Sequence, residues 1–136
     1  MDGTGASDVA TFLAIRGHEP IGIVAARRDK RAVGLFRVAS MWVAPEARRL
    51  GLGLQLLEAV EAWIRTRDGT AARLSVTEAA PGARRLYERA GYKPDGRHGE
   101  LVHTPGLFFV GLQKTLAYAA VPAAPTRAPT RRSKSR

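Results

Sequence analysis

The first part of the chain alternates apolar runs with short polar breaks, as the strands of a sheet do. Residues 9–16 (VATFLAIR) are apolar and β-branched, residues 17–20 (GHEP) carry turn residues, and residues 21–26 (IGIVAA) are apolar again. Two such runs around a four-residue break predict a β-hairpin. Residues 32–43 predict a third strand, and the mostly apolar stretch 38–43 predicts burial on both faces.

A helical period follows the third strand. From Leu54 onward, apolar residues recur at intervals of three and four, and polar residues fill the opposite face. This spacing predicts a helix of about four turns that packs on the sheet through one stripe and ends at Asp68-Gly69. The apolar stripe comprises Leu56, Leu57, Val60, Trp63 and Ile64, and the polar face Gln55, Glu58, Glu61 and Arg65.

The second half of the chain predicts shorter elements. Residues 72–76 predict a strand, and Pro81 fits the first position of a helix that Gly91 ends. The glycines and prolines of residues 93–106 predict a strand broken by turns, and residues 107–113 (LFFVGLQ) predict the last strand. Three strands, a helix, a strand, a helix and two strands indicate a mixed sheet with helices packed on it.

Length and composition fit one globular domain. The chain has 136 residues, of which 45% are hydrophobic, and it contains no cysteine. The absence of cysteine excludes a disulfide framework and a thiol nucleophile, and it suits a reducing cytosol. The start is polar and acidic, unlike a signal peptide, and no apolar run approaches the roughly 20 residues of a membrane helix. We therefore expect a cytoplasmic protein without membrane contact.

The net charge of +10 is unevenly distributed. Residues 117–136 are rich in alanine, proline, threonine and arginine and hold five basic residues and no acid. This composition predicts a disordered basic tail, while residues 1–8 predict a disordered lead and residues 9–116 the folded domain. The remaining +5 suits binding of a polyanionic cofactor and does not by itself indicate DNA binding.

The segment between the third strand and the first helix carries candidate chemistry. Gly51 and Gly53 allow tight backbone angles and close approach of a ligand. The helix that begins there points its free N–H groups at the loop, and Arg48 and Arg49 add positive charge. Together these features favour an anion site, with a diphosphate as the best fit. No Gly-Lys-Ser/Thr follows and the third glycine of a dinucleotide fingerprint is missing. Glycines that merely turn the chain remain the alternative.

Two motifs resemble one known family. The order R-x-x-G-x-G at 48–53, behind V-x-P at 43–45, resembles the acetyl-CoA pyrophosphate loop of the GNAT-family N-acetyltransferases. A second block at 74–92 resembles the family's Asn-x-x-Ala-x-x-Leu-Tyr-x-x-x-Gly-aromatic signature after a strand. Its matching positions are Ala83, Leu86, Tyr87, Gly91 and Tyr92. The resemblance covers roughly residues 9–116.

The resemblance implies a fold and a site. The fold would be an α/β (α+β) structure: a mixed, mostly antiparallel sheet with a splayed parallel strand pair and flanking helices. Acetyl-CoA would lie between the splayed strands, which end near Val43 and Val76. The backbone N–H of Val43 would stabilise the oxyanion, and Tyr87 would protonate the departing thiolate. Without the resemblance, Tyr87 fits a core residue better, because it lies on the apolar stripe. The implied cofactor contacts are Met41, Val43, Arg48, Arg49, Leu50, Gly51, Leu52, Gly53, Leu54, Ala80, Ala83 and Tyr87.

Three features depart from the family pattern. Ala80 stands where the family usually has asparagine. Alanine is a poor helix cap, which costs ~1 kcal/mol, and the substitution predicts weaker cofactor affinity. Only eight residues precede the first strand, whereas the family's sheet begins with a further strand and two helices. Three explanations are open: the chain is a shortened variant with an open cleft, a partner protein covers the cleft, or the start codon is placed too far downstream. We slightly favour the misplaced start codon. The third strand carries no carboxylate that could serve as a general base, so none is assigned.

The expected function is therefore acetyl transfer from acetyl-CoA to a primary amine by direct attack, without a metal. The alternative is a degenerate GNAT fold that binds acyl-CoA or a protein partner without turnover. A nucleic-acid role of the basic tail is a third and weaker hypothesis. The amine acceptor is not indicated by the sequence, and the uncovered edge of the first hairpin allows a homodimer.

Overall fold

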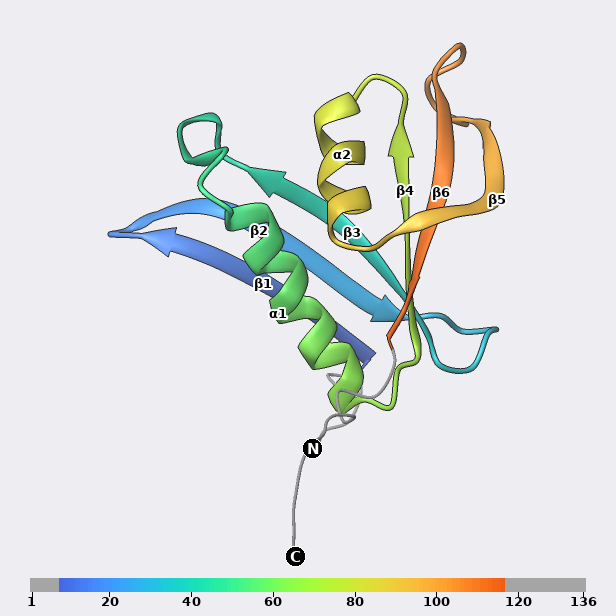
Figure 1. Ribbon diagram of the computed structural model, residues 1–136, viewed down its shortest axis with the longest axis horizontal. Helices are drawn as coiled ribbons and strands as arrows, with labels where there is room; N and C mark the ends of the chain where they lie inside the picture. The colour runs from blue at the N-terminus through green and yellow to red at the C-terminus, as the bar shows by residue number, and fades with distance from the viewer. Residues whose placement is uncertain (1–7, 117–136) are drawn as a thin grey trace, which may run out of the picture.

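The computed structural model describes residues 8–116, which form a six-stranded sheet and two α-helices (Figure 1). The chain order is β1 (Val9–Arg16), β2 (Glu19–Arg28), β3 (Leu35–Val43), α1 (Leu52–Thr66), β4 (Ala71–Thr77), α2 (Pro81–Arg89), β5 (Lys93–Glu100) and β6 (Phe108–Thr115). This order confirms the one predicted from the sequence. Residues 1–7 of the predicted lead and all of the predicted tail lie outside the described residues. Neither helix in this part of the chain is long and apolar enough to cross a membrane.

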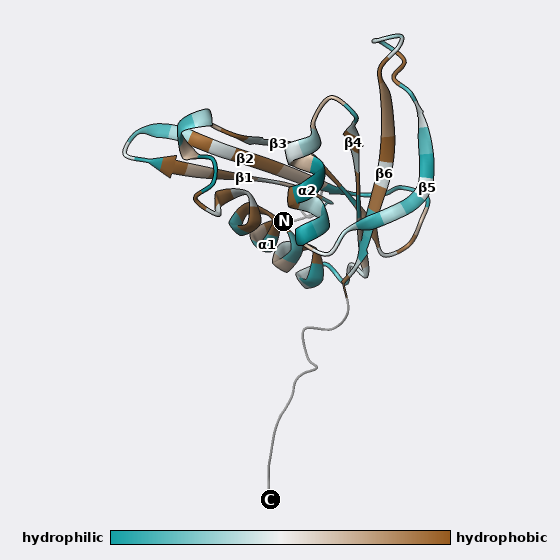
Figure 2. Cartoon of the chain, turned by 45° about the horizontal axis from the view of Figure 1, so that its top comes forward, coloured by the Kyte–Doolittle hydropathy of each residue, from teal (hydrophilic) through white to brown (hydrophobic). Residues whose placement is uncertain are grey.

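The sheet is mixed and mostly antiparallel, as predicted. Its strand order is β1-β2-β3-β4-β6-β5, and every neighbouring pair is antiparallel except β3 and β4. The parallel pair joins two antiparallel halves, β1-β2-β3 and β4-β6-β5. Both helices lie on the same side of the sheet in the two views, α1 across the first half and α2 beside β4 (Figures 1 and 2).

The two halves touch edge to edge over a short distance. Strands β3 and β4 pair only at Leu35–Ala71, Phe36–Ala72 and Arg37–Arg73. Beyond Arg37 the two strands are no longer paired, and they separate toward their carboxyl ends (Figure 1). Backbone N–H and C=O groups on the facing edges are therefore available to a ligand in the opening.

The core fills the space between α1 and the sheet. Four members of the predicted stripe of α1 are buried, and Trp63 packs edge-on against the buried Phe36 ring at 5.5 Å. The side chains of Val24, Val60, Ile64 and Leu112 have no exposed surface. The apolar period of the sequence therefore identified the buried face of this helix correctly.

Glu61 is an exception to the predicted polar face, because it is only 3% exposed. Its carboxylate accepts hydrogen bonds from the Tyr92 hydroxyl and from Lys114 Nζ, each at 2.8 Å. Burial, followed by the adjacent Glu61 charge, raises the pKa of Tyr92, which therefore stays a donor. The three residues link α1, in the first half of the molecule, to the β6 side of the second half.

The prediction that residues 38–43 are buried on both faces is wrong. Val38 is buried, but Ala39 and Ser40 are exposed and Trp42 is 45% exposed. In the described part of the chain the helices cover one side of the sheet, so alternate residues of β3 face outward. Ser40 has a φ of 62°, and the β2–β3 register shifts beside it, which marks a bulge in β3.

Three element boundaries also differ from the prediction. The first hairpin turns at Gly17-His18 alone, with Gly17 at φ 66°. The predicted broken strand is continuous over Lys93–Glu100, because Gly96, at φ 92°, lies in an irregularity of the β5–β6 register and does not end the strand. The last strand begins at Phe108, one residue later than predicted.

The β2–β3 loop depends on Asp29. Its carboxylate accepts hydrogen bonds from the backbone N–H groups of Ala32 (2.7 Å) and Arg31 (3.0 Å) and from Arg37 Nε (2.7 Å). These bonds, led by the one from Ala32, lower the pKa of Asp29 to about 2.

We expect the Asp29→Asn variant to be less stable than the wild type at neutral pH. A depressed folded-state pKa stabilises the protein above the unfolded value of about 3.9, and this contribution is lost as the pH falls toward 2. The difference in free energy of unfolding between wild type and variant should therefore shrink between pH 5 and pH 2 in urea titrations. Asp68→Asn, at an exposed position, is the control. A difference that does not change with pH would contradict the prediction.

Candidate active site

The segment from β3 to α1 is a tight, ordered loop. Pro45 begins a single 3₁₀ turn, Pro45–Ala47, and the Ala47 N–H donates to the Ala44 carbonyl at 2.8 Å. Arg49 and Gly51 then adopt left-handed backbone angles, with φ of 69° and 80°. A Cβ added at Gly51 would meet no atom within 4 Å. The backbone angle, and not lack of space, is therefore what favours glycine there.

The N-terminus of α1 opens onto this loop. The first backbone bond of the helix runs from the Gln55 N–H to the Gly51 carbonyl at 3.1 Å, and no side chain caps the end. The N–H groups of Leu52, Gly53 and Leu54 therefore have no acceptor within the helix. They lie at the positive end of the helix dipole, which favours an anion.

Gly53 also permits close packing of the two helices. A Cβ at this position would come within 2.8 Å of Leu86 Cδ2 on α2. The missing side chain lets α2 approach the first turn of α1, so the two helices form adjacent walls of one cavity.

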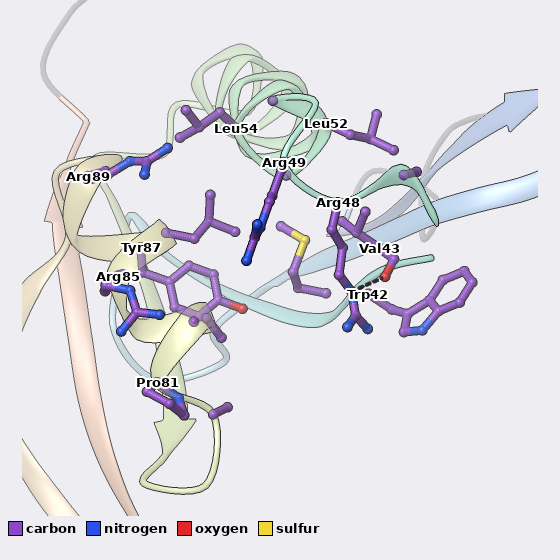
Figure 3. Close-up of a pocket in the computed structure, with 18 of the residues that line it drawn as sticks. Trp42, Val43, Arg48, Arg49, Leu52, Leu54, Pro81, Arg85, Tyr87 and Arg89 are labelled. Carbon is purple, nitrogen blue, oxygen red and sulfur yellow. Dashed lines mark hydrogen bonds between the residues drawn. The ribbon is translucent and has the colours of Figure 1, made fainter. Parts of the chain in front are cut away.

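That cavity has a volume of about 670 Å³ and lies between the loop, the end of β3 and α2 (Figure 3). Its size is in the range of roughly 300–1,000 Å³ that is typical of ligand pockets. The structure brings eleven of the twelve predicted cofactor contacts together in its lining: Met41, Val43, Arg48, Arg49, Gly51, Leu52, Gly53, Leu54, Ala80, Ala83 and Tyr87. Leu50 is not among the lining residues and is 66% exposed, so its contact with the cofactor stays a prediction.

Four arginines and no carboxylate line the cavity. Arg48 and Arg49 come from the loop, while Arg85 and Arg89 lie one turn apart on α2. Sequence reasoning missed the pair on α2, although their spacing of four residues places them on one helix face. The other lining residues that it missed are Trp42, Ala47, Ala79, Pro81, Gly82 and Leu86.

The two loop arginines differ in their surroundings. Arg48 Nε donates to the Val43 carbonyl at 2.9 Å, which holds this side chain against the end of β3 (Figure 3). Arg49 extends into the cavity (Figure 3). Arg49 is therefore the better placed of the two to meet a ligand anion directly.

The backbone of Val43 faces the opening between the strands. The next residue, Ala44, donates its N–H to the Ile21 carbonyl on β2 at 2.8 Å. Because successive N–H groups of a strand point in opposite directions, the N–H of Val43 points away from β2, toward the gap between β3 and β4.

Tyr87 lies on α2 with its ring buried and its hydroxyl turned into the cavity (Figure 3). The side chain is 7% exposed, and its ring meets Tyr92 edge-on at 6.2 Å. Within residues 8–116 no group forms a hydrogen bond with the Tyr87 hydroxyl. Burial raises the pKa of the Tyr87 phenol above its ordinary value, so the hydroxyl keeps its proton at neutral pH.

Comparison with known proteins identifies the family of the chain. A model of the acetyltransferase (GNAT) family matches residues 3–92. The chain belongs to the GNAT family. The GNAT resemblance found in the two sequence motifs is thereby confirmed.

Solved structures of GNAT and other acetyltransferases share the fold. The ribosomal-protein-S18-alanine N-acetyltransferase of Escherichia coli is 16% identical and has a TM-score of 0.68, with 86% of this chain and 75% of that chain covered. A GNAT-family acetyltransferase of Streptococcus pneumoniae is 22% identical, with a TM-score of 0.68 and coverages of 82% and 68%. An aminoglycoside 6'-N-acetyltransferase complexed with coenzyme A is 15% identical, with a TM-score of 0.67 and coverages of 80% and 73%.

The N-terminus of α2, like that of α1, has no side-chain cap, and for α2 the sequence predicted a poor cap. Ala80 is the N-cap residue of α2 and forms no side-chain hydrogen bond. The Arg84 N–H donates to the Ala80 carbonyl at 3.1 Å, so the N–H groups of Gly82 and Ala83 have no acceptor within the helix. An asparagine at position 80 would supply an acceptor that alanine lacks.

Proposed function

We propose that this chain transfers an acetyl group from acetyl-CoA to a primary amine by direct attack. The observation that carries the proposal is the Tyr87 hydroxyl, which is protonated and unpartnered among the described residues and shares one cavity with the anion loop. Membership of the GNAT family supports acetyl transfer, and a structural relative complexed with coenzyme A supports the donor. Two relatives that are named N-acetyltransferases support nitrogen as the acceptor.

The cavity fits the charge of the donor. Its lining of four arginines and no carboxylate suits a molecule that carries a diphosphate. The free N–H groups at the start of α1, with Arg49 beside them, would hold the diphosphate. The acyl-bearing arm would then lie along the separated edges of β3 and β4, and the thioester would lie near Val43 and Tyr87.

The reaction would proceed in these steps. The neutral amine nitrogen attacks the thioester carbon, a C–N bond forms, and the carbonyl oxygen gains the negative charge. The N–H of Val43 donates to that oxygen, a contact worth ~3 kcal/mol of barrier. The C–S bond then breaks, and Tyr87 gives its proton to the thiolate. The new ammonium group loses a proton to solvent, and Tyr87 takes one back.

Replacing Arg49 with alanine should weaken coenzyme A binding by about tenfold or more. A charge-assisted hydrogen bond contributes about 1.5–3 kcal/mol, and 1.4 kcal/mol corresponds to a tenfold change in the dissociation constant. Isothermal titration calorimetry measures the change. Arg84→Ala is the matched control, because Arg84 pairs with Glu88 at 3.0 Å and does not line the cavity. Equal affinities for wild type and Arg49→Ala would place the diphosphate elsewhere.

A further inference from the structure

The Arg48 side chain reaches back from the loop to the end of β3. Its Nε donates to the Val43 carbonyl at 2.9 Å, although five positions separate the two residues (Figure 3). The backbone between them turns tightly, because the Ala47 N–H donates to the Ala44 carbonyl at 2.8 Å and the Arg48 N–H to the Pro45 carbonyl at 3.3 Å. The side-chain bond therefore fixes the position of the strand end relative to the loop.

The N–H and the carbonyl of Val43 face the same side of β3. Val43 lies opposite Gly22 of β2, and the next N–H, that of Ala44, donates to the Ile21 carbonyl at 2.8 Å. Val43 and Gly22 are therefore a non-hydrogen-bonded pair, in which the N–H and C=O groups of both residues point away from the partner strand. Strand β4 pairs with β3 only over residues 35–37, so within residues 8–116 no strand meets Val43 on its second side. Arg48 supplies the donor that a neighbouring strand would otherwise give to the Val43 carbonyl.

Two bonds hold the peptide group between Val43 and Ala44. Arg48 binds its carbonyl, and the Ile21 carbonyl accepts its N–H on the opposite edge of the strand. The direction of the Val43 N–H follows from the orientation of this peptide group, because only the φ and ψ angles of Val43 separate the two peptide planes. Loss of the Arg48 bond would therefore loosen the Val43 N–H through the backbone.

We propose that Arg48 is a positioning residue for acetyl transfer, and not a ligand of the diphosphate. It holds Val43 so that the Val43 N–H points at the oxyanion. This inference rests on the proposed function, which gives that N–H its role. An oxyanion donor acts at about 2.7–3.1 Å from the oxygen, and a displacement of about 1 Å can cost about 100-fold in rate. A single bond that fixes the strand end is therefore enough to change kcat.

The two neighbouring arginines of the loop then have separate tasks. The Arg48 guanidinium lies beside Val43 and uses its Nε to bind the protein, whereas Arg49 extends into the cavity (Figure 3). The diphosphate is proposed to lie at the free N–H groups at the start of α1, beside Arg49. Changes at Arg48 should therefore appear in kcat, and changes at Arg49 in the affinity for coenzyme A.

The first test separates kcat from affinity in the full-length protein, with the amine that gives the wild type its highest rate of thiol release. Arg48→Ala should lower kcat by about 10–100-fold at saturating acetyl-CoA and leave the dissociation constant of coenzyme A within about threefold of the wild type. Arg48→Gln keeps an N–H donor for the Val43 carbonyl and should recover kcat to within about threefold of the wild type. Arg84→Ala is the control at an ion pair outside the cavity, and it should change neither value.

Two kinetic results would overturn the proposal. One is an unchanged kcat in Arg48→Ala, and an accompanying loss of affinity of about tenfold or more would then make Arg48 a phosphate ligand. The other is an equal loss of kcat in Arg48→Ala and Arg48→Gln, which would assign the effect to the charge of Arg48 and not to its bond with Val43.

The second test needs no turnover and therefore distinguishes this proposal from the proposed function. Hydrogen exchange of the Ala44 N–H, followed by NMR, reports how firmly the peptide group beside Val43 is held. The exchange should become about tenfold faster in Arg48→Ala and stay near the wild-type rate in Arg48→Gln. A wild type that acetylated no amine but showed this exchange pattern would contradict acetyl transfer and still support the hold of Arg48 on Val43. Unchanged exchange in Arg48→Ala would overturn the positioning role, whatever the activity.

Discussion

Replacing Tyr87 with phenylalanine should lower kcat for acetyl transfer by about 10²–10⁴-fold and leave the affinity for acetyl-CoA almost unchanged. Phenylalanine keeps the buried ring and its edge-on contact with Tyr92. The variant lacks the phenol hydroxyl and therefore cannot donate a proton to the departing thiolate. Release of free coenzyme A thiol, followed with a panel of primary amines, measures kcat, and calorimetry measures binding.

The pH profile separates the acid role from a purely structural one. Burial raises the pKa of Tyr87, so the protonated phenol persists into the alkaline range and is lost as the pH rises through the folded value. The wild-type kcat should therefore fall only above about pH 10, and this alkaline decline should be absent from Tyr87→Phe.

Tyr92→Phe is the matched control for Tyr87→Phe. Tyr92 is also a buried tyrosine, but its hydroxyl donates to Glu61 and it does not line the cavity. Its loss should lower the stability and leave kcat of the folded enzyme near that of the wild type. If Tyr87→Phe kept kcat within about twofold of the wild type, Tyr87 would be a core residue alone. If instead the wild type released no coenzyme A thiol with any amine, the alternative of a GNAT fold that binds without turnover would gain support.

Replacing Lys114 with methionine should lower the free energy of unfolding by about 3–5 kcal/mol, because it breaks an ion pair with a buried carboxylate. Lys114 Nζ donates to the buried Glu61 carboxylate at 2.8 Å, and methionine leaves that charge with the Tyr92 hydroxyl as its remaining donor among the described residues. Urea denaturation measures the free energy of unfolding.

Two further variants test whether the buried charge is the cause. Lys93→Met removes an exposed lysine from the start of β5 and should change the stability little. Replacing Glu61 with leucine, Tyr92 with phenylalanine and Lys114 with methionine together removes the whole polar cluster and should recover most of the loss. A triple variant that is no more stable than Lys114→Met would show that shape, and not charge, decides the stability at this site.

Local patterns predicted the elements and the cavity loop well. The apolar period that starts at Leu54 identified the buried side of α1, and Gly51 has a left-handed φ, in line with the tight backbone angles expected there. Both features depend on residues close together in the sequence, which is why periodicity and turn chemistry reveal them. The GNAT motifs then supplied the long-range arrangement that local patterns lack.

The misses are long-range features. Glu61 fits an exposed helix face by period, and only its partners on distant segments, Tyr92 and Lys114, explain its burial. The exposure of Trp42 depends on which side of the sheet the helices cover. Arg85 and Arg89 join the cavity because α2 packs against Gly53, a contact that the sequence does not encode locally.

The short β3–β4 pairing leaves the two halves of the sheet weakly connected to each other. Three residue pairs connect β3 to β4. The hydrogen bonds of Glu61 with Tyr92 and Lys114 connect the same two halves through the interior. A ligand that filled the cavity would contact the loop after β3 in one half and α2 in the other, and would therefore hold the two halves together beside the short β3–β4 pairing. Occupancy of the cavity would then stiffen the whole fold and not merely the walls around the ligand.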